Sequence, residues 1–484
     1  MSELIAASGD PELRRLAAGT LLVAFKGTTA PDWVLHDLEN GLGGVTLFGF
    51  NVADPGQLSA LTSRLREAGD PVVSLDEEGG DVTRLAYHVG SPYPGNAALG
   101  AVDDVELTQR VYRSIGDELA SCGVNLDMAP SADVNTADDN PVIGTRSFGS
   151  DTALVARHTV AAVHGLQSAC VAACVKHFPG HGATRQDSHL EIPLVDASFE
   201  LLRERELVPF RAAIEAGTKS IMTAHVRVPV LTGAAPATLS DAALTHLLRG
   251  ELGYDGVVIT DALDMHAITE SVGLAGGAVL SLAAGADLLC LGPIPTEKDV
   301  RHIIAGIVAA VHEGRLPAAR LEEAAERVAR LRAWFGTPGT GQAEKSVIGL
   351  TAARRAVTLT GSASPLVDPL VVEMETPPTI AVGDVPWGFS PLMPQAEVVR
   401  VKPEDADVPN ILERAIGRSL IVVVKDAHRY QTSQAVVSAL LATRPDATVV
   451  EMGLPIWRPD AATYLATYGA ARANAQAAAE LLSI

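Results

Sequence analysis

The segment from Lys176 to His189, KHFPGHGATRQDSH, gathers three histidines, a lysine, an arginine and an aspartate around two glycines and a proline. Asp187 and His189 stand two residues apart in a stretch where the glycines exclude regular structure. A carboxylate at that offset can bind an imidazole and fix its tautomer. Because histidine titrates near neutrality, such a pair can deliver and recover a proton. The spacing therefore predicts acid–base chemistry, which needs a nucleophile opposite it.

Two other uses of these histidines compete with proton transfer. His177, His181 and His189 could ligate a metal, but Pro179 and Gly180 prevent the first two from sharing a helix face as in a HExxH zinc site. No cysteine or second carboxylate cluster stands close by, so we expect neither a metal nor another cofactor. The histidines could also only bond to loop backbone, which is the role we expect for His181 taken alone.

The candidate nucleophile is Asp261, within VVITDALDM. It follows an apolar run directly, so its carboxylate would leave the end of a buried strand and point into a pocket. Asp264 falls three residues on, in the next loop or helical turn. The alternative is that Asp261 only caps the following helix.

Eight short apolar runs alternate with segments of helical period, the pattern of a parallel sheet with crossover helices. The runs cover residues 19–25, 44–49, 71–76, 124–130, 171–178, 220–226, 256–263 and 287–292. Eight such units predict a (β/α)8 TIM-like barrel, whose reactive groups collect at the carboxyl ends of the strands. Polar residues do end five of the runs: Asp76, Asp127, Lys176 with His177, His225 and Asp261. Asp127 and His225 could equally serve only to bond neighbouring loops.

We expect the barrel to span residues 1–336, followed by a Pro/Gly-rich linker at 337–350 and a smaller α/β layered domain at 351–484. In that domain PLVVEME (369–375), TIAVG (379–383), SLIVVVKDA (419–427) and ATVVEMG (447–453) predict strands. SQAVVSALLAT and YGAARANAQAAAELL predict helices. The domain has no strong cluster of catalytic residue types.

The formal net charge of -21 argues against nucleic acid as a partner, because the average surface repels phosphate. No apolar run reaches the roughly 20 residues of a membrane span. Acidic residues before the first apolar run argue against a signal peptide. The four cysteines form no CxxC pair, so we expect buried free thiols and a cytoplasmic protein.

Four motifs together resemble a known family. KHFPGHG, followed after four residues by DSH, occurs with DEEGGDVTR, IGTRSFG and ITDALDM, as in the β-N-acetylglucosaminidases of glycoside hydrolase family 3. The resemblance covers residues 1 to about 340, and the C-terminal part looks like that of the two-domain members. It implies Asp261 as nucleophile, His189 as general acid/base and Asp187 as its orienting partner. It also implies a set of sugar-binding residues: Asp76, Arg84, Arg146, Lys176 and His177. Arg84 could instead only brace Asp76.

These roles predict a retaining two-step mechanism on terminal β-linked N-acetylglucosamine. An imidazole that has given up its proton is neutral and does not repel an anion, so phosphate could replace water as acceptor. Hydrolysis is our expectation, and phosphorolysis, known in some members of the family, is the alternative. The resemblance also implies cell-wall recycling. None of the four tryptophans ends a predicted barrel strand, which favours a short exo-acting pocket.

Two further classes stay open on sequence grounds. A silent sugar-binding module would not need a nucleophile facing an acid, so Asp187, His189 and Asp261 argue against it. A metal-dependent barrel hydrolase would lose activity on chelation. The partner that we expect is a small carbohydrate with a terminal N-acetylglucosamine.

Overall fold

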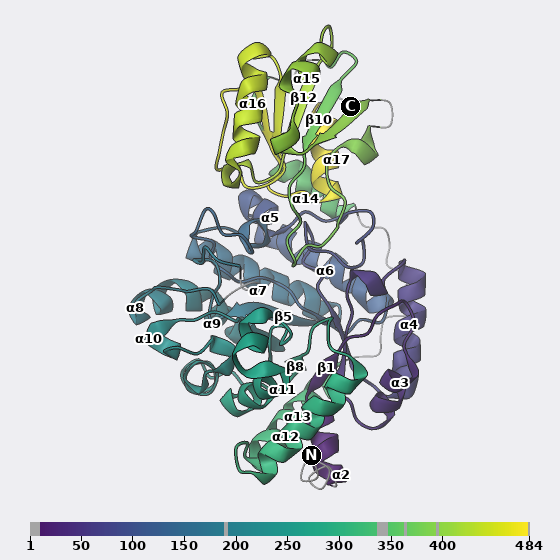
Figure 1. The fold of residues 1–484 in the computed structure, drawn as a ribbon, viewed down its shortest axis with the longest axis vertical. Coiled ribbons are helices and arrows are strands. Elements are labelled where there is room, and N and C mark those ends of the chain that lie inside the picture. Colours follow the sequence, from purple (N-terminus) through teal and green to yellow (C-terminus); the bar gives the residue numbers. More distant parts are fainter. Residues whose placement is uncertain (1–9, 188–191, 336–346, 363–364, 394–395, 483–484) are drawn as a thin grey trace.

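The computed structural model describes residues 10–187, 192–335, 347–362, 365–393 and 396–482 (Figure 1). Its first sheet has eight parallel strands that follow one another around the sheet in chain order, from β1 to β7, with β8 beside β1. A bridge between Ile259 and Leu288 joins β7 to the segment before β8, so the sheet closes on itself. The predicted barrel and its eight strands are confirmed: β1 (Leu21–Val23), β2 (Gly44–Thr46), β3 (Val72–Leu75), β4 (Leu126–Asp127), β5 (Ala172–Phe178), β6 (Ser220–Thr223), β7 (Val257–Ile259) and β8 (Leu289–Cys290).

Helices surround the barrel, and several begin where the sequence places an aspartate. Asp54, Asp104 and Asp151 each accept a hydrogen bond from the backbone N–H three residues on and so cap α4, α6 and α7. The larger helices are α2 (Pro11–Gly19), α3 (Asp32–Glu39), α4 (Pro55–Ala68), α5 (Asn96–Val102), α6 (Val105–Ser121), α7 (Thr152–Ser168), α9 (Leu207–Glu215), η5 (Ala242–Glu251), α11 (His266–Ala284), α12 (Glu297–His312) and α13 (Ala318–Trp334).

Apolar side chains fill much of the interior of the barrel. Leu22, Val72, Leu126, Val257 and Leu288 belong to one buried cluster, which Val328 and Leu331 of α13 join. A larger cluster fills the layer between the strands and the surrounding helices. Burial on both faces explains why the strands read as continuous apolar runs.

Among the described residues α11 is the one helix whose length and composition would suit a membrane span, with a mean hydropathy of 1.5. It packs against α12 in the outer layer of the barrel, and Gly273 interrupts it with a φ of 69°. Its place between neighbouring barrel elements accounts for its apolar composition.

A second sheet contains six strands in the order β11-β10-β12-β13-β14-β9, of which only β9 runs antiparallel to its neighbour. Helices α15 (Val408–Arg414) and α16 (Gln431–Thr443) lie on one side, and α17 (Arg472–Leu481) packs with the other. The strands are β9 (Thr358–Gly361), β10 (Leu370–Met374), β11 (Glu397–Val401), β12 (Leu420–Val424), β13 (Thr448–Glu451) and β14 (Thr463–Ala466). The prediction of a smaller α/β layered domain is confirmed.

One predicted strand of this domain is wrong. Residues 379–383, TIAVG, form a loop that reaches the barrel, where their carbonyl groups bond to a side chain instead of a neighbouring strand. Three strands that the sequence did not reveal, β9, β11 and β14, complete the sheet. Most of the predicted linker at 337–350 lies outside the described residues, and its last residues belong to α14 (Ile348–Ala356), so the domain boundaries stay a prediction.

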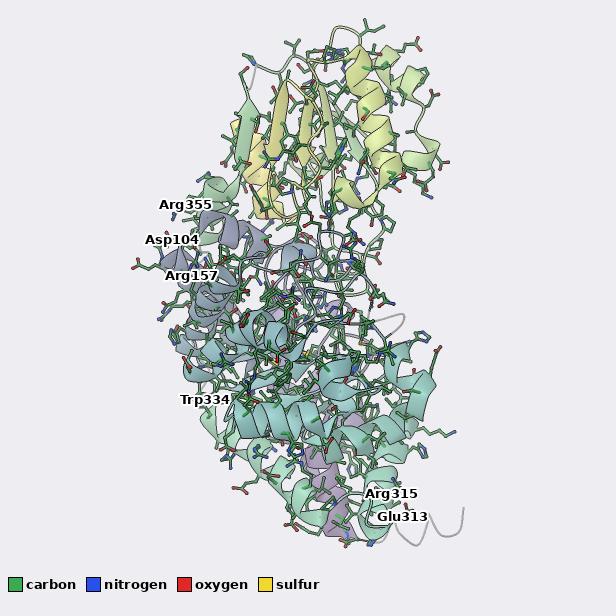
Figure 2. All side chains as sticks on the ribbon, turned by 90° about the vertical axis from the view of Figure 1, so that its left-hand side faces the viewer. Asp104, Arg157, Glu313, Arg315, Trp334 and Arg355 are labelled. Carbon is green, nitrogen blue, oxygen red and sulfur yellow. The ribbon has the colours of Figure 1, made fainter. Side chains whose placement is uncertain are left out.

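The second domain rests on the side of the barrel that carries α5 and α6 (Figure 1). Arg355 of α14 pairs with Asp104, the cap of α6, at 2.6 Å (Figure 2). Asp81 of the barrel pairs with Lys425 at 3.2 Å and accepts a hydrogen bond from the backbone of Ala470. The contact between the domains therefore includes buried polar bonds as well as packing.

Candidate active site

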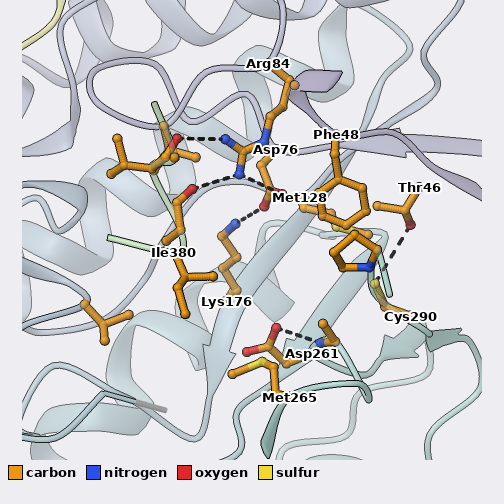
Figure 3. A pocket seen from close by; sticks show the side chains of 18 of the residues that line it. Thr46, Phe48, Asp76, Arg84, Met128, Lys176, Asp261, Met265, Cys290 and Ile380 are labelled. Carbon is orange, nitrogen blue, oxygen red and sulfur yellow. Dashed lines mark hydrogen bonds and ion pairs between the residues drawn. The ribbon is translucent and has the colours of Figure 1, made fainter. Parts of the chain in front are cut away.

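A cavity of about 400 Å³ lies at the carboxyl end of the barrel (Figure 3). Its wall contains residues that end or follow the strands, together with residues 380–383 of the second domain. It brings together six of the residues singled out in the sequence: Asp76, Arg84, Arg146, Lys176, His177 and Asp261. Asp187 is described but is not among the described residues of the wall, and His189 lies outside the described residues.

Lys176 is the centre of a buried ionic network. Its ammonium lies 2.6 Å from Asp76 and 2.7 Å from Glu78, and only 2% of its side chain is exposed. Arg146 binds Glu78 through two nitrogens, at 2.7 and 2.9 Å. Such charge-assisted and bidentate bonds hold the side chains in one geometry. The network therefore presents fixed donors and acceptors to the cavity.

Mutual pairing determines the ionisation of this network. Burial opposes the charged form of Asp76, but Lys176 and Arg84 outweigh it and hold the pKa of this carboxyl below its usual range. Burial also opposes the charge on Glu78, and Arg146 and Lys176 again bring its pKa well below the ordinary value. Conversely, the two carboxylates overcome desolvation and raise the pKa of Lys176. All of these groups are thus charged at neutral pH.

Arg84 joins the network to the second domain. One of its terminal nitrogens lies 3.6 Å from Asp76 and donates to the carbonyl of Ala381 at 2.8 Å, while the other donates to Val382 at 3.4 Å (Figure 3). Its backbone N–H is held by the buried carboxyl of Glu77. The bracing of Asp76 that the sequence left open is therefore present, together with a domain contact that the sequence did not reveal.

Two histidines of the KHFPGHG segment lie in the cavity wall, each held by a partner behind it. His177 Nδ1 lies 2.7 Å from Asp133, a carboxyl whose pKa falls to about 2 because His177 outweighs the effect of burial. His181 Nδ1 lies 2.7 Å from the hydroxyl of Thr184. Burial lowers the pKa of His181 to about 4, so its imidazole is neutral at pH 7, and its Nε2 has no hydrogen-bond partner among the residues that the structure describes. His181 therefore lines the cavity in addition to bonding within its own loop.

Asp261 stands two residues after β7 and lines the cavity (Figure 3). One carboxylate oxygen accepts a hydrogen bond from the N–H of Ala262 at 2.8 Å. The following helix, α11, begins at His266 with Met265 at its N-cap, so Asp261 does not cap it. Asp264 accepts a hydrogen bond from the N–H of Ile294 at 2.9 Å and holds the loop after β8 against the same side of the cavity.

Asp127 and His225 are not among the described residues of the cavity wall. Asp127 accepts a hydrogen bond from the backbone of Glu77, and burial raises its pKa well above the ordinary value. His225 is in hydrogen-bond contact with Thr238 at 2.8 Å and with the carbonyl of Ala262 at 2.9 Å. These two strand-end residues have the loop-bonding role that the sequence offered as their alternative.

Sequence reasoning missed Glu78, Asp133 and the loop at 380–383. Glu78 had a usable signal, because a buried lysine and arginine need carboxylates and DEEGG offers three adjacent ones. Asp133 had none beyond its place six residues after a strand. In the part of the chain that the structure describes, no three side chains are grouped as metal ligands.

The cysteines differ in one case from the expectation. Cys122, Cys174 and Cys290 are buried free thiols, and burial raises the pKa of Cys174 and of Cys290 to about 12. Cys170 is exposed, so its predicted burial is wrong. It occupies the turn between α7 and β5 with a φ of 61°, outside the apolar run that it precedes.

Known proteins match this chain over the barrel and, in structure, over both domains. A β-hexosaminidase A from Pseudoalteromonas piscicida is 34% identical over 318 residues, 60% of this chain and 53% of that protein, so the match spans about half of its length. A β-hexosaminidase from Stenotrophomonas maltophilia is 34% identical over 59% of this chain and 87% of its own. The structure of a family 3 β-N-acetylglucosaminidase from a Paenibacillus species is 33% identical, with a TM-score of 0.86 over 97% of this chain and 96% of that one.

The structure of a β-glucoside phosphorylase, BglX, has a TM-score of 0.76 over 99% of this chain and 92% of its own. At 19% identity it shows a common fold and nothing about the acceptor. The model described as the glycosyl hydrolase family 3 N-terminal domain matches residues 22–331, which include every cavity residue of the barrel named above. The chain belongs to glycoside hydrolase family 3.

Proposed function

We propose that the protein is a retaining, exo-acting β-N-acetylglucosaminidase that hydrolyses terminal β-linked N-acetylglucosamine. One observation carries the proposal: the carboxylate of Asp261 and the ionic network around Lys176 line the same cavity. A carboxylate beside a pocket of fixed donors and acceptors suits attack on the anomeric carbon of a bound sugar. The names of the related enzymes point to the same substrate.

The polar residues of the cavity suit a neutral sugar ring. Asp76 accepts hydrogen bonds from sugar hydroxyls, whereas Arg84, Arg146 and Lys176 donate them. His177 adds a further polar contact. Because the charges of these groups compensate one another, the site binds hydroxyl groups by direction and needs no charged substrate. A wall closed by the second domain on one side also favours a single terminal sugar over a long chain.

In the first step Asp261 attacks the anomeric carbon. A bond forms between this carbon and a carboxylate oxygen, the bond to the leaving oxygen breaks, and that oxygen takes a proton from His189. In the second step His189 accepts a proton from water, the water oxygen bonds to the anomeric carbon, and Asp261 leaves as a carboxylate. Asp187 orients the imidazole throughout. The two steps give the sugar with its β configuration retained.

Water is favoured over phosphate as the acceptor by the charges of the cavity wall. Its described part contains three Lys and Arg side chains, Arg84, Arg146 and Lys176, and each is paired with a carboxylate. A phosphate dianion binds best beside cations that are free to pair with it. Phosphorolysis remains the second candidate because the neutral imidazole left after the first step does not repel an anion.

We further propose, from the family resemblance, that the enzyme acts in the cytoplasm on cell-wall fragments during recycling. Its partners would be carbohydrates with a terminal N-acetylglucosamine, and neither nucleic acid nor a membrane is part of the proposal.

Product analysis tests the proposal. The protein should release p-nitrophenol from its β-N-acetylglucosaminide, and proton NMR of the early reaction should show the β anomer of free N-acetylglucosamine. The same product should dominate when phosphate is added. Sugar 1-phosphate as the main product would establish phosphorolysis instead, and an initial α anomer would exclude the retaining mechanism.

A further inference from the structure

The cavity changes character from its buried floor to its opening. The floor is ionic: Lys176, which lines it, is only 2% exposed and pairs with Asp76 and Glu78. The opening carries three large apolar side chains that line the same cavity and are exposed to solvent: Phe50 (43% exposed), Ile294 (73%) and Ile380 (62%). We refer to these three residues as the apolar mouth. Large apolar side chains that gather at one opening mark a binding surface better than scattered ones do.

The apolar mouth is assembled from three separate parts of the chain. Phe50 belongs to the loop after β2, Ile294 to the loop after β8, and Ile380 to the loop of the second domain. Figure 3 shows Ile380 on one side of the cavity and Phe48 on the other, and the ring of Phe48 stacks on that of Phe50 with centroids 5.6 Å apart. Apolar groups therefore stand on different sides of the opening.

Each part of the mouth is held in place by hydrogen bonds beside it. Asn51 next to Phe50 donates to the carbonyls of Phe25 and Gly27, at 2.8 and 2.7 Å. The N–H of Ile294 donates to Asp264 at 2.9 Å, and the carbonyl after Ile380 accepts from Arg84 at 2.8 Å. A surface whose backbone is already fixed loses little freedom on binding. The backbone that carries these three side chains is therefore held in the position that exposes them.

We infer that the apolar mouth is a subsite for the leaving group, and that it takes aglycones with an apolar face, such as an alkyl or aryl group or the apolar face of a second sugar. The inference rests on the proposed function. The hydroxyls of the terminal sugar occupy the ionic floor, so the leaving oxygen and its substituent point to the opening. There the aglycone covers Phe50, Ile294 and Ile380, and apolar area on both sides leaves water. Ile380 makes the second domain part of substrate selection.

Alkyl glycosides separate this contact from the chemistry. The n-propyl and n-hexyl β-N-acetylglucosaminides have leaving alcohols of equal acidity and differ only in apolar area. We expect kcat/KM of the wild-type protein to be about five- to tenfold higher for the hexyl compound, because methylene groups are removed from water. Ile380→Ser and Ile294→Ser should each lower this ratio about two- to threefold, and the double variant should bring it close to one.

The chain provides a matched control. Ile416 is 76% exposed, belongs to the same domain as Ile380 and does not line the cavity, so Ile416→Ser should leave the ratio unchanged. Release of p-nitrophenol by every variant shows that the sugar site and the catalytic groups work. If the double variant keeps the wild-type ratio, or if the wild-type protein does not distinguish the two alkyl compounds, the subsite is wrong and the proposed function stands. If the wild-type protein cleaves none of the three glycosides, the proposed function is wrong and the subsite fails with it.

Discussion

The carboxyl ends of the parallel strands carry similar residues in the barrel and in the second sheet, but the contacts of these residues differ. In the barrel, Lys176 of β5 pairs with Asp76 and Glu78, and Lys176 and Asp76 line an open cavity. In the second domain Glu373 of β10 accepts hydrogen bonds from the backbone of Phe389 and Ser390 and pairs with Arg400. A strand-end carboxylate thus either holds its own loops or meets a cavity, and its partners decide which.

The same distinction exists within the barrel. Asp127 and Asp261 occupy strand-end positions that look alike in the sequence. Asp127 bonds to the backbone of a neighbouring loop, whereas Asp261 lines the cavity. Residue type and strand position therefore select candidates, and the direction of the side chain separates those that line the cavity from those that bond to loops. Six variants test this separation.

The largest effect should come from Asp261. Asp261→Ala removes the proposed nucleophile, so kcat for p-nitrophenyl β-N-acetylglucosaminide should fall on the order of 10³–10⁵-fold while the circular dichroism spectrum stays unchanged. Asp127→Asn is the matched control, because burial raises the pKa of this carboxyl and an asparagine keeps an oxygen for the N–H of Glu77. It should stay close to wild-type activity. Equal losses in the two variants would erase the distinction between them.

Lys176→Met should have the next largest effect. It leaves Asp76 and Glu78 without their shared ammonium, and removal of one partner from a buried ion pair costs about 3–5 kcal/mol of unfolding free energy. KM should rise as well, because the sugar loses a donor and the network loses its centre. Urea unfolding and initial rates measure the two effects.

Lys425→Met offers the comparison from the second domain, where Lys425 follows β12 and pairs with Asp81. It should lower stability with little change in KM. A rise in KM as large as that of Lys176→Met would show that the domain contact and the sugar site are one unit.

Glu206 is a buried carboxyl group that neither lines the cavity nor has both of its oxygens bonded to a loop. It lies under Gly180 of the histidine segment, where an added Cβ would stand 2.9 Å from its Oε2. Within the described parts of the chain this oxygen has no hydrogen-bond partner. Burial raises its pKa to about 7 despite Arg205. The folded state therefore keeps a proton that the unfolded state loses above pH 4.5, so this group's contribution to stability falls as pH rises from about 4.5 to 7, by up to about 3 kcal/mol.

In Glu206→Gln that loss should be absent. Relative to wild type, the variant should gain stability between pH 5 and pH 8, which urea midpoints at the two values measure. A difference between the two proteins that does not change with pH would mean that Glu206 is already ionised in the fold at pH 5.

The smallest effect belongs to the second domain. Glu373→Gln keeps an oxygen for the backbone N–H groups but places an amide beside Arg400, so stability should fall by about 1 kcal/mol. kcat/KM should not change, because the residue is not part of the described cavity wall. A loss of activity without a loss of stability would contradict this assignment.

The barrel could be predicted because its strands are buried on both faces and read as continuous apolar runs, five of which end in a polar residue. The strands of the second domain at its edges could not. All four residues of β9 are exposed, and β11 is mostly half-buried, so neither shows an apolar run. TIAVG has the composition of a strand, yet Arg84, 297 positions away from Ala381 in the chain, binds its carbonyl groups. Such a distant partner is not visible in local pattern.

The candidate site was predictable as a set of residue types and not as a set of contacts. Lys176 and Asp76 were found because polar groups at strand ends are unusual. Asp133 was missed because it lies in a loop, and its pairing with His177 requires the folded chain. Asp261 stays a predicted nucleophile, and what the fold adds is that α11 begins too late for it to serve as a cap.

The hydrogen bonds of Arg84 to the second domain go to the main-chain carbonyls of Ala381 and Val382, not to the side chains of that loop. A bond of this kind is indifferent to which amino acids the loop contains, provided that the backbone keeps its path. The side chains at positions 380–382 are therefore the ones to vary in a test of the proposed aglycone subsite, because their exchange leaves these two bonds between the domains in place.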